Sequence, residues 1–338
     1  MKQVLQWGVV GTGGIADAFA EALKKSSRCR AVNVVGTSSE KARAFRDRWE
    51  LPSSSADLNE LLRDPHVEAV YIASPHPSHE AQAIACIDAG KHVLCEKPIT
   101  LEAATAARVI AAAERRKVFL MEAYMYRCHP LLKALIERLK AGVIGPIRHV
   151  RADFAFRVPR DPDGRLFNLK LGGGGILDVG GYPVSFSRLI AGLVEGTPFA
   201  EPIKLDAFGK MGPTGADELA IAFLTFASGF TAECTSGVSY EVGTTAVVFG
   251  ETGRIVLPNP WIPAGDRQGL ETSFTIHRDG KADETVAITT EMPTYAIEAE
   301  LVLDSLPGQQ PAWPAMTWAD TLGNLRVMET WRAALRTS

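Results

Sequence analysis

Three side chains able to move a proton stand at two separate places in the sequence. Lys97 lies where an apolar run ends and a helix-like run begins, and Asp178 and Tyr182 lie four residues apart in a later helix-like run. This spacing puts the carboxylate and the phenol on one face of a helix. A phenol ionises near pH ~10, and a nearby ammonium lowers that value. We therefore predict a Tyr182–Lys97 pair that moves a proton, with Asp178 orienting the base or holding a substrate hydroxyl.

The same residues also have a purely structural interpretation. A tyrosine in a helix is commonly a packing residue, and an aspartate near a helix start commonly interacts with the helix dipole. The chemical interpretation gains weight only if a reactive cofactor lies nearby. The residues that could bind one stand further towards the amino terminus.

The first of these is a glycine turn of the kind that binds dinucleotides. Residues 11–16 read Gly-Thr-Gly-Gly-Ile-Ala, after an apolar β-type run over 4–10 and before a helical run over 15–25. In that context the first glycine allows a tight turn, and the second lets backbone N–H groups approach a pyrophosphate. The small Ala16 lets the helix pack on the strand. We predict cofactor contacts at Gly11, Thr12, Gly13, Gly14 and Ile15.

The tip of the second strand bears on the choice of nicotinamide cofactor. Proteins that bind NAD usually place an acid at this tip, for the ribose hydroxyls. Here the tip carries Thr37 and Ser38, followed by Lys41 and Arg43. Hydroxyl donors and positive charge suit a 2′-phosphate. NADP is therefore favoured, and Glu40 keeps NAD possible.

A second loop leaves the most apolar predicted strand, over residues 67–74, at its carboxyl end. It contains Ser74, Pro75, His76 and His79, and we expect it to lie against the ribose and nicotinamide. The two histidines could also suggest a metal pair. No third ligand is evident in the sequence, so we expect no metal site.

The order of predicted elements indicates two domains. Over residues 1–126, β-type and helical runs alternate, which predicts an α/β Rossmann domain with a doubly wound parallel sheet. Over 127–338, several strand-like runs between turn residues predict an α+β domain with a large open, mainly antiparallel sheet for substrate binding and oligomerisation. An open sheet must bury its free face, and a twofold partner is the usual solution.

Composition excludes several classes of function. The formal net charge of −3 gives no attraction to nucleic acid or to an anionic membrane. Five scattered cysteines form no CxxC pair and suggest neither a disulfide framework nor a zinc site. The amino terminus is too short and polar for a signal peptide, and no apolar run approaches the ~20 residues of a membrane helix. We expect a cytoplasmic protein.

Taken together, the motifs resemble the glucose–fructose oxidoreductase/inositol dehydrogenase/MocA (Gfo/Idh/MocA) superfamily of NAD(P)-dependent oxidoreductases, over nearly the full chain. The resemblance implies a Rossmann domain, a carboxyl-terminal domain with a large open sheet, and frequent dimers or tetramers packed through that sheet. The motifs that carry it are Gly11–Ala16, Cys95-Glu96-Lys97-Pro98, Gly173–Tyr182, Tyr295, Glu298 and Asn324–Glu329.

Residue by residue, the resemblance places the active-site lysine of the family on Lys97 and its aspartate on Asp178. Many members have histidine where this chain has Tyr182. Tyrosine there resembles the branch with dimeric dihydrodiol dehydrogenase and NADP-dependent xylose dehydrogenase, which implies sugar or diol oxidation with NADP. The resemblance also implies substrate contacts from Arg165, and cofactor contacts from Arg127 and from Glu96 and Lys97 in the Glu-Lys-Pro motif.

The prediction from all of this is an NADP-dependent oxidoreductase. It would transfer a hydride between the nicotinamide and a secondary alcohol or hemiacetal carbon of a sugar, polyol or diol, with Lys97, Arg165, Asp178 and Tyr182 around the substrate. Lys97 could itself carry the proton while Tyr182 only positions the substrate. Two other classes stay open, which are a cofactor-dependent glycosidase of the same superfamily and a non-catalytic NADP-sensing protein.

Overall fold

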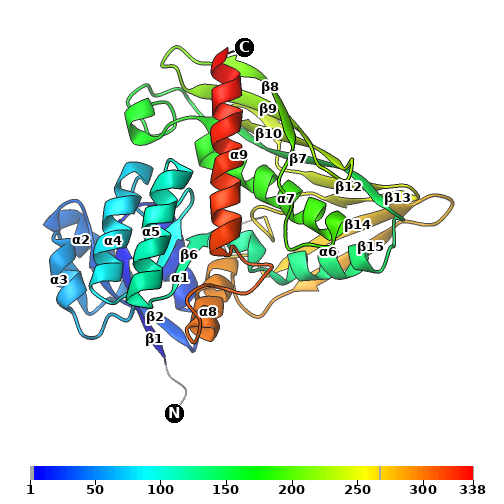
Figure 1. Cartoon of the computed structure of the whole chain (residues 1–338). Coiled ribbons are helices and arrows are strands. Elements are labelled where there is room, and N and C mark those ends of the chain that lie inside the picture. The colour runs from blue at the N-terminus through cyan, green and yellow to red at the C-terminus, as the bar shows by residue number, and fades with distance from the viewer. Residues whose placement is uncertain (1–3, 266–267, 338) are drawn as a thin grey trace.

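The computed structural model describes residues 4–265 and 268–337, which form two α/β parts joined side by side (Figure 1). The first part is a six-stranded sheet in the order β3-β2-β1-β4-β5-β6, with every pair parallel. This order and direction confirm the predicted doubly wound Rossmann sheet. Its elements are β1 (Leu5–Val10), α1 (Gly14–Leu23), β2 (Cys29–Val35), α2 (Ser39–Trp49), β3 (Ser53–Ser55), α3 (Leu58–Arg63), β4 (Ala69–Ile72), α4 (His79–Asp88), β5 (His92–Glu96), α5 (Ala103–Arg116) and β6 (Leu120–Ala123).

Helices cover both faces of this parallel sheet, so its central strands are mostly apolar. All four residues of β4 are buried. Two elements have no counterpart in the sequence-based assignment, namely β3 and α3. β3 consists of three serines at the sheet edge, and a short polar edge strand carries no hydrophobic period to predict it.

The second part is built on a nine-stranded sheet. Its main path runs β15-β14-β13-β12-β7-β10-β9-β8, and β11 pairs with β7. β7 and β10 run parallel and the other pairs are antiparallel, which confirms a large, mainly antiparallel sheet. The strands are β7 (Ile147–Arg157), β8 (Lys204–Met211), β9 (Asp217–Thr225), β10 (Thr231–Gly237), β11 (Ser239–Gly243), β12 (Ala246–Gly250), β13 (Gly253–Leu257), β14 (Glu271–Arg278) and β15 (Glu284–Thr289).

Helices α6 (Pro130–Lys140) and α7 (Gly181–Glu195) belong to this second part, and α7 packs on β7 and β10. The sequence indicates one helix-like run that carries both Asp178 and Tyr182. Instead, Ile176–Gly180 form one π-helical turn that leads directly into α7. Such turns recur at functional sites because they re-aim the side chains they carry. Here the turn carries Asp178, and α7 carries Tyr182 in its first turn.

The last two helices connect the two parts. α8 (Thr294–Ser305) packs on α1, and α9 (Trp318–Thr337) packs on α5 of the first part as well as on α7 and β8 of the second. Figure 1 shows α9 standing along the junction. Residues far beyond position 126 therefore contribute to the core of the first part, although the two sheets themselves lie on either side of that position. Among the described residues, no helix has both the length and the apolar character that crossing a bilayer requires.

Candidate active site

Lys97 follows β5 at the carboxyl edge of the parallel sheet, and buried acids hold the backbone around it. Its peptide bond to Pro98 is cis. One residue on, the N–H of Ile99 donates to Glu122 Oε1 at 3.0 Å. Burial raises the pKa of Glu122 to about 7. On the other side, the backbone N–H of Lys97 donates to Glu96, which also accepts a hydrogen bond from the hydroxyl of Tyr71. The backbone on both sides of Lys97 is thus held by hydrogen bonds to buried carboxyl groups.

The structure brings Lys97 and Asp178 together across 81 positions of sequence. Lys97 Nζ donates to the backbone oxygen of Asp178 at 2.6 Å and lies 3.7 Å from its Oδ1. Arg165 Nη1 donates to the same Oδ1 at 2.8 Å. Burial alone would raise the pKa of Asp178, but the charges of Lys97 and Arg165 hold it below its usual value. One carboxylate is thus flanked by two cations, of which Arg165 is 56% exposed.

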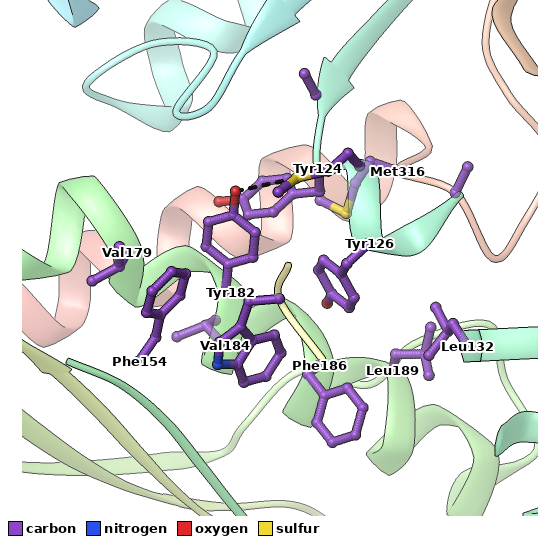
Figure 2. Packing of buried hydrophobic residues seen from close by; sticks show 14 of the residues in the cluster. Tyr124, Tyr126, Leu132, Phe154, Val179, Tyr182, Val184, Phe186, Leu189 and Met316 are labelled. Carbon is purple, nitrogen blue, oxygen red and sulfur yellow. Dashed lines mark hydrogen bonds between the residues drawn. The ribbon is translucent and has the colours of Figure 1, made fainter. Parts of the chain in front are cut away.

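Tyr182 lies beside this cluster, with Lys97 Nζ 5.4 Å from the centroid of its ring. The phenol is enclosed by aromatic side chains, including Tyr124 at 5.0 Å and Phe154 at 5.2 Å between centroids (Figure 2). Its hydroxyl donates to Met125 Sδ at 3.5 Å.

This position corrects one expectation. Burial, together with the charge of Glu96, raises the pKa of Tyr182 well above its usual value. The ammonium of Lys97 lies over the ring rather than at the hydroxyl, so the predicted lowering of the phenol pKa is wrong in this structure. The phenol therefore holds its proton at neutral pH.

His76 enters the same site from the loop after β4. Burial and the neighbouring charge of Lys97 lower its pKa to about 3, so the ring is neutral. Its Nδ1 is buried and has no protein hydrogen-bond partner. A β-carbon on Gly172 would lie 3.3 Å from that nitrogen, which places His76 against the segment leading to Asp178. This ring nitrogen is therefore enclosed between the loop after β4 and the glycine run that leads to Asp178.

His79, in contrast, connects two loops. It is fully buried, and its ring nitrogens lie 2.9 Å from the oxygen of Pro98 and 2.8 Å from that of Ser74. Burial lowers its pKa, so a neutral ring donates to one of these carbonyls at a time. Ser74 Oγ donates to Gln82, and Pro75 is exposed at the edge. His79 thus links the loop after β4 to the Lys97-Pro98 segment. The described residues contain no group of three or more His, Cys, Asp or Glu side chains that could hold a metal ion.

The glycine turn has the shape that a pyrophosphate requires. Gly11 has φ of +116°, and a β-carbon there would lie 2.6 Å from the oxygen of Ala73. Gly13 precedes α1 without a side-chain cap, and nothing lies within 4 Å of where its β-carbon would be. The first N–H groups of α1 therefore start beside open space, with Gly14 exposed and Thr12 and Ile15 half-buried. This geometry fits a dinucleotide at the site.

The tip of β2 keeps the features that favour a 2′-phosphate. Thr37 is exposed, and Ser38 caps α2 by accepting from the N–H of Lys41 at 3.2 Å. Lys41 and Arg43 are exposed on α2. These side chains gather hydroxyl and cationic groups at the place where an adenine ribose would end.

Arg127 lies elsewhere. Its side chain is fully buried, and its guanidinium donates to the oxygen of Pro314 at 2.6 Å and to Asp320 Oδ2 at 2.7 Å. Arg188 flanks the other oxygen of Asp320. We interpret Arg127 as part of this buried ion-pair network, and a cofactor contact by it stays a prediction.

Sequence reasoning did not identify Met125, Glu122 or Phe154 as neighbours of the site. Met125 and Glu122 come from the segment at the end of β6, the next strand of the parallel sheet after β5. The signal available was topological, since the carboxyl ends of neighbouring parallel strands meet at one edge. Phe154 comes from β7, whose position relative to that edge no local pattern predicts.

Comparison with known proteins places the chain among nicotinamide-dependent oxidoreductases. Residues 5–124 match the oxidoreductase family with an NAD-binding Rossmann fold, and residues 132–256 match the GFO/IDH/MocA C-terminal domain. Trans-1,2-dihydrobenzene-1,2-diol dehydrogenase of Mus musculus is 36% identical over 77% of this chain and 76% of its own length, and that of Homo sapiens is 33% identical over the same shares. A 3-ketoreductase from Actinomadura kijaniata, crystallised with NADP and TDP-benzene, is 26% identical with a TM-score of 0.84, covering 98% of both chains.

Proposed function

The chain belongs to the GFO/IDH/MocA oxidoreductase family, and we propose that it is an NADP-dependent enzyme acting on a secondary alcohol or hemiacetal of a sugar, polyol or diol. The observation that carries this proposal is the convergence of Lys97, Asp178 and Tyr182 at the carboxyl edge of the Rossmann sheet. That edge is where an open parallel sheet binds a dinucleotide and its substrate. Arg165 and His76 complete the polar surface available to the substrate.

Each of these residues has a role that follows from its position. When bound, NADPH would supply a hydride from C4 of its nicotinamide, and the oxidised form NADP+ would accept one there. The protonated phenol of Tyr182 gives its proton to the carbonyl oxygen in the reductive direction and takes it back in the oxidative direction. The ammonium of Lys97 stabilises the oxyanion as it forms on the substrate. Asp178 and Arg165 hold neighbouring hydroxyls.

The preference for NADP rests on the tip of β2. Exposed Lys41 and Arg43, with the hydroxyls of Thr37 and Ser38, suit the additional phosphate of NADP. The related 3-ketoreductase was crystallised with NADP. A comparison of NADPH and NADH binding by fluorescence titration tests this choice. Tighter binding of NADH than of NADPH would overturn it.

The reaction is tested by following NADPH absorbance with aldoses, polyols, diols and keto sugars in both directions. Lys97→Met and Tyr182→Phe, each measured at saturating substrate, then separate the two roles. If Tyr182→Phe keeps full turnover over the whole pH range, Tyr182 does not carry the proton and Lys97 takes that role. If the wild-type protein turns over none of these substrates, the oxidoreductase proposal fails. A cofactor-dependent glycosidase would instead retain NAD tightly and release an aglycone with no net absorbance change.

We further propose that two copies of the chain pair through the open face of the nine-stranded sheet. The outward-facing side chains Phe208 and Phe223 are 66% and 39% exposed on neighbouring strands β8 and β9. Large apolar side chains gathered on one sheet face mark an interface. Light scattering on the wild type is expected to give a dimer or a larger even assembly. Phe223→Asp is expected to weaken it, and a wild-type monomer at micromolar concentration would overturn the proposal.

For the compartment we propose the cytoplasm. The five cysteines are free thiols in the structure, and four of them are buried. Free buried thiols are ordinary in reducing compartments. Cell fractionation with an antibody against the chain tests this, and recovery from an oxidising or extracellular fraction would contradict it.

A further inference from the structure

The glycine run Gly172–Gly175 precedes the segment with Asp178 and Tyr182, and none of its members has a role in the chemistry above. Each glycine faces a different neighbour at close range. A β-carbon on Gly172 would lie 2.8 Å from Leu101 of the Rossmann part, and one on Gly175 would lie 3.0 Å from the α-carbon of Gly237 in β10. The run therefore threads a gap between the two parts that is wide enough for backbone only.

The third glycine of the run lies against a buried carboxylate. Gly174 has φ of +119°, and a β-carbon there would collide with Asp217 Oδ1. The other oxygen of Asp217 accepts from the N–H of Ile176 at 2.7 Å, and the N–H of Gly175 also faces the carboxylate. The first N–H groups of a helix have no partner within it, and a carboxylate is a strong acceptor for them. Here the cap comes from β9, 41 positions later in the chain.

One turn separates this cap from the candidate active site. The N–H of Asp178 donates to the oxygen of Gly174 at 3.1 Å, and the backbone oxygen of Asp178 accepts from Lys97 Nζ. We propose that Asp217 is a positioning residue whose buried carboxylate fixes the start of the segment that carries Asp178 and Tyr182. The inference rests on the proposed oxidoreductase function, because Asp217 would maintain the geometry of the proton-transfer site.

The buried charge of Asp217 lowers the free energy of unfolding, so the residue does not serve stability alone. Burial raises its pKa from 3.8 to about 6, although the facing N–H groups and the charge of Arg332 on α9 oppose the rise. A carboxyl with a raised folded-state pKa binds its proton more tightly when folded, so the free energy of unfolding falls as pH rises from about 4 to about 6. Asp217 lines a small pocket together with Leu169, Met211 and Arg332.

The variant Asp217→Asn tests the proposal, since it keeps the size and removes the charge. The carboxamide keeps only one acceptor oxygen, so an N–H donor would replace the other oxygen that the backbone N–H groups of Gly175 and Ile176 now face. We expect kcat above pH 7 to fall about 10- to 100-fold, because small misplacements of reacting groups cost that much. The Kd for NADPH is expected to stay within about twofold and the Tm to be unchanged or higher, because the buried charge is gone. Amide exchange of residues 176–182 should accelerate.

The pH profile gives a readout that a structural role would not move. In the wild type, turnover should fall as pH drops through about 6, where Asp217 takes up its proton. Asp217→Asn should lack this acidic limb, whereas a limb caused by Glu122, whose pKa is about 7, would persist in the variant. The matched control is Glu218→Gln, which removes the next carboxylate of the same strand, one paired with Arg160 instead. It should leave the kcat and the pH profile unchanged.

The proposal is overturned if Asp217→Asn keeps wild-type kcat and the same acidic limb, even if amide exchange is faster. Gly174→Ala adds a β-carbon that would collide with the carboxylate of Asp217. It should reproduce the loss of kcat and the faster exchange. A wild type with no turnover would refute the oxidoreductase function. In that case, unchanged exchange of residues 176–182 in Asp217→Asn would independently refute the anchoring.

Discussion

Two aspartates in this molecule are each flanked by two cations, and their surroundings differ. Asp178 lies between Lys97 and Arg165, whose side chains are 15% and 56% exposed. Asp320 lies between Arg127 and Arg188, whose side chains are both fully buried.

The difference in exposure supports the proposal that the same residue types serve chemistry at Asp178 and architecture at Asp320. The donors of Arg127 end on Pro314, Ser185 and Asp320, all within the protein. At Asp178, Arg165 reaches the carboxylate from the exposed loop after β7, so a ligand can compete for it. Buried ion pairs add little net stability but cost much when one partner is removed. Partly exposed pairs rearrange readily, which a substrate site requires.

The largest effect is expected at the more exposed of the two clusters, the one around Asp178. Lys97→Met removes the ammonium that we propose stabilises the developing oxyanion, and kcat should fall about 10³-fold. The Tm should change little, because Arg165 still pairs with the carboxylate of Asp178 and the methylene stem is retained. Steady-state turnover with NADPH and thermal unfolding by circular dichroism measure the two quantities. A loss of Tm in parallel with activity would mean that this cluster is structural too.

Asp320→Asn gives the reverse pattern. It leaves Arg127 and Arg188 buried without their shared counter-charge, and the free energy of unfolding should drop by about 3 kcal/mol. Urea unfolding followed by tryptophan fluorescence measures this. The fraction that remains folded should keep its KM for substrate. An unchanged urea midpoint would show that the buried network contributes nothing to stability.

A smaller effect is expected from Arg165→Met. Loss of one exposed donor should raise KM for substrate about 10-fold, with little change in stability. Because the charge of Arg165 helps to hold the pKa of Asp178 down, its removal raises that pKa. Any fall in turnover caused by protonation of Asp178 should therefore move to higher pH. A pH–rate profile of the variant beside the wild type checks the direction, and a shift to lower pH would contradict it.

The smallest effect is expected from Arg127→Lys, which keeps the charge but loses the planar fork of donors. Stability should fall by about 1 kcal/mol, as shown by the urea midpoint, and the Kd for NADPH should not change. This variant also tests the cofactor contact predicted for Arg127 from the family resemblance. Weaker NADPH binding with an unchanged urea midpoint would support that contact and would give Arg127 a functional role rather than a structural one.

The sequence predicted the fold well where a period or a motif was present. The parallel order of the first sheet follows from strand–helix alternation, and the glycine turn lies where a dinucleotide needs it. The pairing of Lys97 with Tyr182 was predicted from their chemistry, and the resemblance then placed the family's lysine and aspartate on Lys97 and Asp178. No local rule brings residues 81 positions apart into contact. The π-helical turn and the raised pKa of Tyr182 were not predicted. Both depend on tertiary packing, since a pKa is set by burial and by charges from other elements.

The placement of α8 and α9 constrains the order in which the chain can fold. A ribosome completes both sheets before residues 294–337 exist, yet Leu325 belongs to the core of the Rossmann part, and Glu329 accepts the N–H of Ala103 at the start of α5. Gln309 accepts the N–H of Leu120 on the edge strand β6. Domains otherwise tend to fold in order of synthesis. Until residues 294–337 are synthesised, the Rossmann part therefore lacks these contacts and exposes the edge of β6. An exposed strand edge is prone to aggregation, so chaperones would be most needed during this interval.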